Sequence, residues 1–211
     1  MPICAICGTN QGTTRDHVPP KSIFPKPRPS NLITVPACIE CNNGASVYDD
    51  LFKVFLSLQA TESNEMARRL FEEKTLKTLR RNSVLLERIK EESKEIEVIN
   101  NDGELETRTG VLWDSQAHDA VIERTIRGLY FHHVGEPLSE ETELSVQWLK
   151  EIPRELMPRL NLFTRVEIGD NQVTYKYLIY DQDPRLSVWL FDFYGAHWAS
   201  GHTSPIGPTR F

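Results

Sequence analysis

The sequence lacks a long apolar run, since nothing in it approaches the roughly 18 consecutive apolar residues that a membrane-spanning helix requires. The first residues, Met-Pro-Ile-Cys, carry neither the basic stretch nor the apolar stretch of a secretory signal peptide. Internal repeats and low-complexity segments are also missing. We therefore expect a cytoplasmic protein with no membrane partner, in a reducing compartment where disulfides are rare.

An excess of basic residues is missing too. The net charge of the 211 residues is −6, whereas proteins that bind nucleic acid usually present a basic surface. The balance is uneven, because residues 1–45 hold four basic against two acidic side chains and so carry +2, which leaves −8 for the rest. Contacts with phosphate are therefore expected near the N-terminus.

Cysteine is scarce, and its four copies form two Cys-x-x-Cys pairs, Cys4 with Cys7 and Cys38 with Cys41. Two short loops of this spacing, joined by a longer connection, bring four thiolates to one tetrahedral zinc ion. The alternative is two disulfides in a secreted domain, which the missing signal peptide disfavours. The pairs predict a zinc site that holds residues 1–45 together, and such a site is often purely structural.

Three side chains near these pairs suit chemistry at a second metal ion. Asp16 and His17 lie between the pairs, and Asn42 directly follows the last cysteine. A carboxylate oxygen from Asp16 and an amide oxygen from Asn42 suit Mg²⁺ or Mn²⁺, with Asn43 as an alternative ligand. His17 would then be free to take a proton from water.

These motifs together resemble the HNH, or ββα-metal, endonucleases in their zinc-containing, treble-clef-like form. The resemblance covers residues 4–46, about a fifth of the chain. The last histidine of the commonest HNH pattern is replaced by Asn42, as in the subset typified by endonuclease VII. The matching segments are Cys4-x2-Cys7, Asp16-His17-Val18-Pro19, Asn31-Leu32-Ile33 and Cys38-Ile39-Glu40-Cys41-Asn42.

The resemblance implies a metal-dependent endonuclease that hydrolyses DNA phosphodiester bonds, with His17 as the general base. It further implies that Asp16 and Asn42 bind the catalytic Mg²⁺ or Mn²⁺ and that Asn31 fixes the loop that orients His17. Bacterial HNH proteins of this kind often serve phage defence or mobile elements. Four basic residues nearby are expected to contact DNA phosphates, namely Arg15, Lys21, Lys26 and Arg28.

The predicted fold class is α+β, with an HNH unit at residues 1–60 fused to a helical and antiparallel-sheet body at residues 61–211. Helical spacing of apolar residues begins at Ser46, the expected N-cap, and continues through Val47. The acidic body is expected to select substrate, to dimerise or to dock a protein partner. Further elements are expected as two helical stretches over 66–79 and 85–89, a charged helix face over 87–97, a hairpin over 96–112, a helix over 115–132, and strands over 161–168, 173–180 and 186–193.

Two other functions stay open. One is a non-catalytic treble-clef zinc module that binds nucleic acid or protein, in which Asp16 and His17 only form local hydrogen bonds. The other is a regulatory subunit whose nuclease acts inside a larger assembly. Four other histidines suggest packing or no role, because His132 and His133 are adjacent on a helix and His197 and His202 fit no common metal spacing. Gly128, inside a predicted helix, indicates close approach of another element.

Overall fold

The computed structural model describes residues 1–99, 103–150, 152, 154 and 157–207. The chain begins with an antiparallel hairpin, β1 (Thr14–His17) with β2 (Thr34–Ala37), whose connection contains a 3-10 turn. A short helix, α1 (Ile39–Gly44), follows at once. Cys38 caps that helix, because its sulfur accepts the backbone N–H of Cys41.

The helix predicted from Ser46 is α2 (Ser46–Ala60), but two details of the prediction are wrong. Ser46 is not the N-cap: it is already helical, and its hydroxyl donates to the carbonyl of Asn43 at 3.1 Å. Ala45 joins α1 to α2 in a helical conformation, so no extended capping residue is needed. Val47, expected on the inner face, is 67% exposed.

The two further helical stretches are confirmed, and together they form an arm beside α2. The charged run is partly wrong, because helix ends at Glu92 and a strand begins at Ser93. Alternating strand residues expose charges as readily as a helix face does. The elements are α3 (Glu65–Leu70), a π-helical segment (Phe71–Thr75), α4 (Leu76–Arg81) and α5 (Ser83–Glu92).

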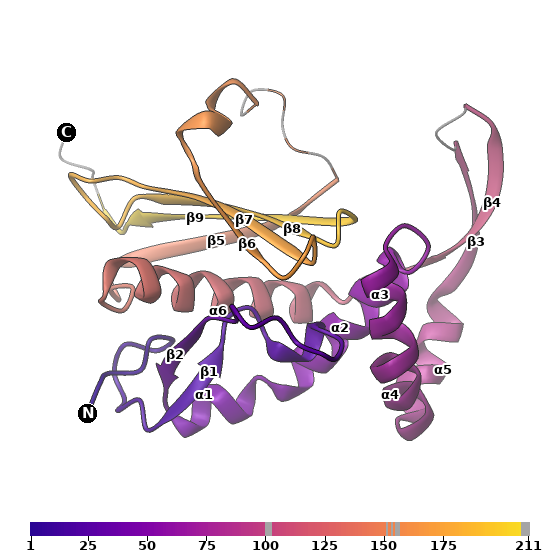
Figure 1. Cartoon of the computed structure of the whole chain (residues 1–211), viewed down its shortest axis with the longest axis horizontal. Helices are drawn as coiled ribbons and strands as arrows, with labels where there is room; N and C mark the ends of the chain where they lie inside the picture. The colour runs from indigo at the N-terminus through magenta and orange to yellow at the C-terminus, as the bar shows by residue number, and fades with distance from the viewer. Residues whose placement is uncertain (100–102, 151, 153, 155–156, 208–211) are drawn as a thin grey trace.

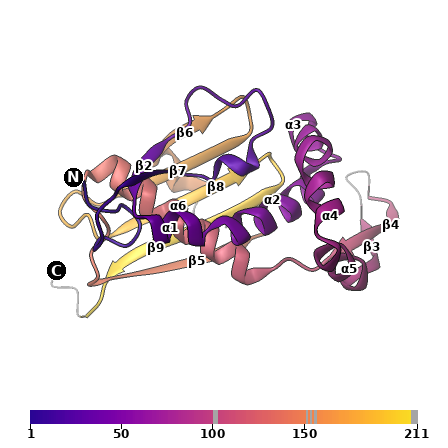
Figure 2. The same cartoon turned by 90° about the horizontal axis from the view of Figure 1, so that it is seen from below.

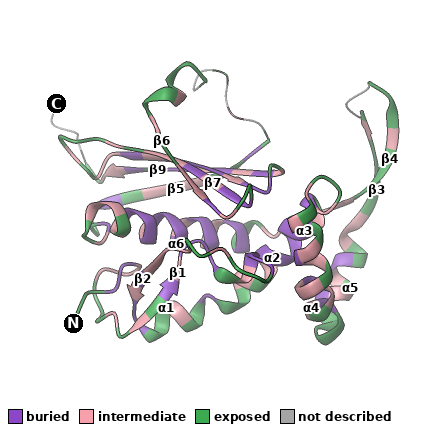
Figure 3. Ribbon diagram, viewed as in Figure 1, coloured by how far each residue is buried: buried purple, intermediate pink, exposed green. Residues whose placement is uncertain are grey.

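The predicted hairpin is also confirmed. β3 (Ser93–Ile99) pairs antiparallel with β4 (Leu105–Val111) in a sheet of two strands. Of its expected turn, residues 100–102 lie outside the described residues. Figure 1 shows this hairpin at the end of the molecule far from the N-terminus, and Figure 3 shows it as largely exposed or partly buried.

A five-stranded antiparallel sheet forms the C-terminal half, in the order β5-β9-β8-β7-β6. Three of its strands match the prediction, although β6 begins after a 3-10 turn that ends at Leu162. The two other strands were not predicted. The strands are β5 (Thr142–Leu149), β6 (Thr164–Ile168), β7 (Val173–Ile179), β8 (Ser187–Phe193) and β9 (His197–Pro205).

Helix α6 (Ser115–Val134) is the central element, as the burial colours of Figure 3 show. Figure 1 places it between the sheet and the N-terminal hairpin, and Figure 2 shows α1 and α2 on the side away from the sheet. Gly128 confirms the predicted close approach: a Cβ there would lie 2.5 Å from Val18 Cγ1. On the opposite side, a Cβ on Gly201 of β9 would collide with Ile126. Helix α6 thus packs closely against Val18, the residue after His17, on one side and against β9 of the sheet on the other.

The main hydrophobic core crosses the predicted division at residue 60. It contains Ala5, Val18 and Phe24 from before that position, together with Ile126 and Trp189 from after it. The division at residue 60 stays a prediction, because the shared core says nothing about whether either part folds alone. Along the described parts of the chain, no helix is long and apolar enough to cross a membrane.

His133 is packed, as predicted, and its position gives an expected pH dependence. It stacks on Tyr177 with ring centroids 4.1 Å apart and shares a 3.0 Å hydrogen bond with the hydroxyl of Tyr175. Burial, and then the neighbouring charge of His132, lowers the pKa of His133 to about 4. The folded protein therefore keeps this ring neutral where the unfolded chain, with a pKa of about 6.5, takes up a proton.

We expect the free energy of unfolding to decrease as the pH falls from about 6.5 to 4, by up to about 1.4 kcal/mol per pH unit from this group. Urea unfolding of wild type and of His133→Phe, which keeps an aromatic ring against Tyr177, measures that slope. The slope for this variant should be smaller than the wild-type slope by the contribution of about one proton. Equal slopes for wild type and His133→Phe would contradict the assignment.

Candidate metal centre and its surroundings

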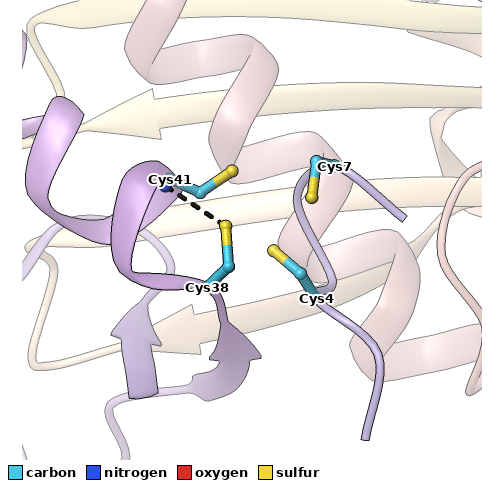
Figure 4. A group of neighbouring side chains, drawn as sticks. All are labelled: Cys4, Cys7, Cys38 and Cys41. Carbon is cyan, nitrogen blue, oxygen red and sulfur yellow. Dashed lines mark hydrogen bonds between the residues drawn. The ribbon is translucent and has the colours of Figure 1, made fainter. Parts of the chain in front are cut away.

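The four cysteines form one cluster, as predicted. Their sulfur atoms all lie within 4.8 Å of one another, and the thiols are free. Figure 4 shows Cys4 and Cys7 on the N-terminal loop facing Cys38 and Cys41 at the start of α1. Four sulfurs at this separation are compatible with structural zinc in tetrahedral coordination.

The surroundings of the sulfurs fit a cation. Cys38 Sγ accepts the backbone N–H of Cys41 at 3.4 Å and the amide of Asn10 at 3.8 Å. Burial, followed by the hydrogen bond with Cys38 and the charges of the other thiolates, raises the pKa of Cys41 well above its usual range. Four crowded thiolates repel one another, and a divalent ion bound by them removes that repulsion.

Asp16 points into the protein, where it meets an arginine of the body. Its Oδ1 accepts the backbone N–H of His17 at 2.8 Å, while Oδ2 lies 3.5 Å from Arg124 Nε. Neither Oδ2 nor Nε has hydrogen-bond geometry with any partner in the described structure. The other end of the guanidinium donates to Asp49 Oδ1 at 2.6 Å, so Arg124 pairs with two carboxylates.

Burial is the main influence on the charges of this cluster. It raises the pKa of Asp16 and of Asp49, and the positive charge of Arg124 opposes that rise at both. Burial also lowers the pKa of His17, followed by the positive charge of Lys21 and opposed by Asp16. His17 is therefore neutral at neutral pH, the form in which an imidazole can accept a proton.

Asn42 lies against the strand that carries Asp16. Its Nδ2 donates to the hydroxyl of Thr14 at 3.1 Å and to the carbonyl of Arg15 at 3.3 Å. Because the amide nitrogen is used in this way, the oxygen is the end available to a metal ion. The hairpin and α1 thus bring Asp16, His17 and Asn42 to the same unit.

The side chain of Asn31 is bound to the backbone of the C-terminal sheet. Its Nδ2 donates to the carbonyl of Glu167 at 2.9 Å, and its Oδ1 accepts the backbone N–H of Gly169 at 3.2 Å. Both ends of the amide are therefore bound to backbone at the end of β6 and in the turn after it, and the expected contact with the loop of His17 is not among the described hydrogen bonds. The side chain attaches the long β1–β2 connection to the sheet.

The four basic residues expected to contact phosphate are all exposed. Arg15 is the most constrained, because its guanidinium donates to the hydroxyl of Thr34 at 2.6 Å and to the carbonyl of Thr34 at 3.2 Å. Arg28 lines a hollow of about 670 Å³ that also contains Arg69 and Asn31. The side chains of Lys21 and Lys26 are free to reach an external anion.

Arg124 and Asp49 are the parts of this cluster that sequence reasoning missed. A signal was present, since Arg124 lies at helical spacing with Ala117, Val121 and Gly128, all on one buried face of α6. A charged residue on an apolar stripe needs a buried partner. The identity of that partner could not be predicted, because Asp16 lies far from Arg124 in the sequence.

Comparison with known proteins finds no matching family model, no matching curated protein and no matching solved structure.

Proposed function

We propose that the chain is a metal-dependent endonuclease of the HNH type that hydrolyses DNA. The observation that carries the proposal is the placement of Asn42, whose amide is bonded to the backbone of β1 beside Asp16 and His17 while its oxygen stays available. A zinc cluster used only for folding requires none of these three side chains. The bonds of Asn42 to the strand that carries Asp16 and His17 support the nuclease over a bare zinc module.

In this proposal the chain's own residues have separate tasks. His17 is half-buried and neutral, so it can accept the proton of a water molecule that attacks phosphorus. The backbone N–H of His17 holds Asp16 Oδ1, which leaves the buried Oδ2 without a hydrogen-bond donor in the described structure. Although Oδ2 lies 3.5 Å from Arg124 Nε, a carboxylate oxygen of Asp16 and the amide oxygen of Asn42 are the ligand types that suit Mg²⁺ or Mn²⁺.

When bound, such an ion would stabilise the charge that develops on the phosphoryl group and the leaving oxygen. Its expected ligands within the chain are Asp16 and Asn42. Lys21, Lys26 and Arg28 would contact flanking phosphates, and the acidic remainder would keep DNA to the N-terminal unit. A role in phage defence or in mobile elements belongs to this proposal as well.

The test is cleavage of supercoiled plasmid with Mg²⁺, with Mn²⁺ and with EDTA. We expect nicking or linearisation by the wild type that requires the metal, and a rate at least about a hundredfold lower for His17→Ala because the general base is gone. His202→Ala, which removes an exposed histidine of β9, should cleave like the wild type. Zinc content should be the same in all three, which separates lost chemistry from lost folding.

A second candidate function is a non-catalytic zinc module that binds nucleic acid or a protein partner. The ion pair of Asp16 with Arg124 favours it. A buried carboxylate held by an arginine joins the hairpin to α6, and this structural role requires no metal ion and no chemistry. Under this alternative no metal and no condition produces cleavage. Wild type and His17→Ala would then bind DNA, or a partner, equally well.

A further inference from the structure

Two buried histidines outside the candidate nuclease site face one cavity. His118 lies in the first turns of α6 and is 3% exposed, and His197 begins β9 and is fully buried. Both line a cavity of about 400 Å³ whose other walls include Trp113 and Trp148. The Nε2 atoms of both rings are buried and have no hydrogen-bond partner in the described structure.

The other nitrogen of each ring is already committed. His118 Nδ1 lies 2.8 Å from a carboxylate oxygen of Asp119, which can only accept while ionised. His197 Nδ1 lies 3.0 Å from Gln59 Oε1, and the amide nitrogen of Gln59 donates to the carbonyl of Ala196, which fixes the oxygen toward His197. Each Nδ1 therefore carries the proton, and each Nε2 presents a bare lone pair.

Two neutral rings, each donating one N–H to an oxygen and leaving the other nitrogen bare, have the arrangement of metal-binding histidines. An unused lone pair in a buried position is otherwise costly.

The spacing of the rings suits a shared ion. Zinc binds an imidazole nitrogen at about 2.0 Å, and the ring centre lies about 1.1 Å behind that nitrogen, so two imidazoles on a tetrahedral ion have centres about 5 Å apart. The observed centroids are 5.2 Å apart, with the ring planes at 73°.

We propose that His118 and His197 form a second metal site, which binds a late first-row transition ion such as Zn²⁺ through their Nε2 atoms. Imidazole nitrogen is a preferred ligand of these ions and a poor one for Mg²⁺. The remaining positions of the ion face the cavity, where water or an external ligand completes the coordination. Trp148, at the cavity wall, is 54% exposed, so the site has a route from solvent.

The test counts zinc in the folded protein. Protein with its cysteine-bound zinc in place is equilibrated with a small excess of Zn²⁺ and with millimolar Mg²⁺, which keeps an all-oxygen site from taking up zinc, and is then desalted. We expect about two zinc ions per chain in the wild type and in His132→Gln, which changes an exposed histidine of the same helix. His118→Gln and His197→Gln should each retain about one.

Asp119→Asn supplies a result that simple packing would not produce. It leaves both Nε2 atoms in place but weakens the orienting hydrogen bond, so zinc affinity at the second site should fall by about 10- to 100-fold. A second measurement uses the wild type alone: Co²⁺ should quench tryptophan emission and saturate near one equivalent, because Trp113 stacks on His197 at 4.3 Å. About one zinc per chain in the wild type, or equal zinc in the wild type and both histidine variants, would overturn the proposal.

Discussion

Replacement of Cys38 by serine is expected to unfold the N-terminal unit and to take much of the body with it. Cys38 is a member of the four-sulfur cluster, so the change removes one of the four ligands that the expected zinc ion requires, while the serine hydroxyl can still cap α1. Structural zinc in small domains contributes about 10–16 kcal/mol, which equals or exceeds the whole stability of a typical domain, about 5–15 kcal/mol. No other single site in the chain is expected to matter as much.

The effect should spread because Ile6, which lies between Cys4 and Cys7, packs against both the small cysteine cluster and the main hydrophobic core. Ala5 lies beside Cys4 in the sequence and belongs to the main core cluster, which also contains Ile126 of α6 and Trp189 of β8. Loss of the hairpin would expose the face of α6 that Val18 covers. The expected outcome is therefore one cooperative loss of structure, not a local fraying of residues 1–45.

Circular dichroism during heating, with reductant present, measures the effect. Both Cys38→Ser and wild type treated with a zinc chelator should lose the transition seen at moderate temperature, and zinc should restore it only in the wild type. Asn10→Ala is the matched control, because it removes the side-chain amide that donates to Cys38 Sγ and keeps all four cysteine ligands. That variant should fold but bind zinc about 10- to 100-fold more weakly. A Cys38→Ser protein that melts within a few degrees of the wild type would contradict a structural role for zinc.

Local features of the molecule were readable from the sequence because each depends on a few neighbouring residues. The spacing of the cysteines predicted the cluster, and the apolar residues of α6, such as Ile122 and Leu129, predicted its buried face. Gly128 indicated close packing, and the residue it meets is Val18, next to His17. The antiparallel strands β6, β7 and β8 followed from β-branched and aromatic residues.

Features that depend on contacts between residues far apart in the sequence could not be predicted. β9 contains Gly201 and two serines, so its propensity for strand is low, yet it pairs with β5 on one side and β8 on the other. Its glycine is required by Ile126, which belongs to α6. His197, for which no role was predicted, is consequently a buried strand residue. The ion pair of Arg124 with Asp16 could not be predicted for the same reason, because the two residues are far apart in the sequence.

That pairing leads to the second large expected effect, on Arg124→Met. The side chain of Arg124 is 7% exposed and pairs with Asp16 at 9% and Asp49 at 19%, so removal of its charge leaves two largely buried carboxylates without a cation. Breaking a buried ion pair in this way typically costs about 3–5 kcal/mol. We expect a loss of that order at pH 7, seen as a shift in the urea midpoint. Arg127→Met, one turn further along α6 and only partly buried, should lose less than about 1 kcal/mol.

The sign of the pH dependence distinguishes this cause from lost packing. Burial already raises the pKa of Asp16 and of Asp49, and Arg124 opposes that rise; without it both carboxylates in the folded protein should titrate still higher. A carboxyl whose folded pKa lies above its unfolded value of about 3.9 adds stability that is present at low pH and lost as the pH rises through the folded pKa. Arg124→Met should therefore regain part of its stability when the pH is lowered from 7 to 5.

Neutralising the carboxylates provides the remaining check. Asp16→Asn combined with Asp49→Asn in the Arg124→Met background should recover much of the lost stability, because no unpaired charge then stays buried. The same triple variant should not cleave DNA if Asp16 serves the proposed nuclease, so stability and activity separate in one protein. If Arg124→Met were as stable as Arg127→Met at both pH values, the ion pairs of Arg124 would contribute nothing to the free energy of unfolding. Asp16 would then be free of the body, and its place in the candidate site would depend on the hairpin and α1 alone.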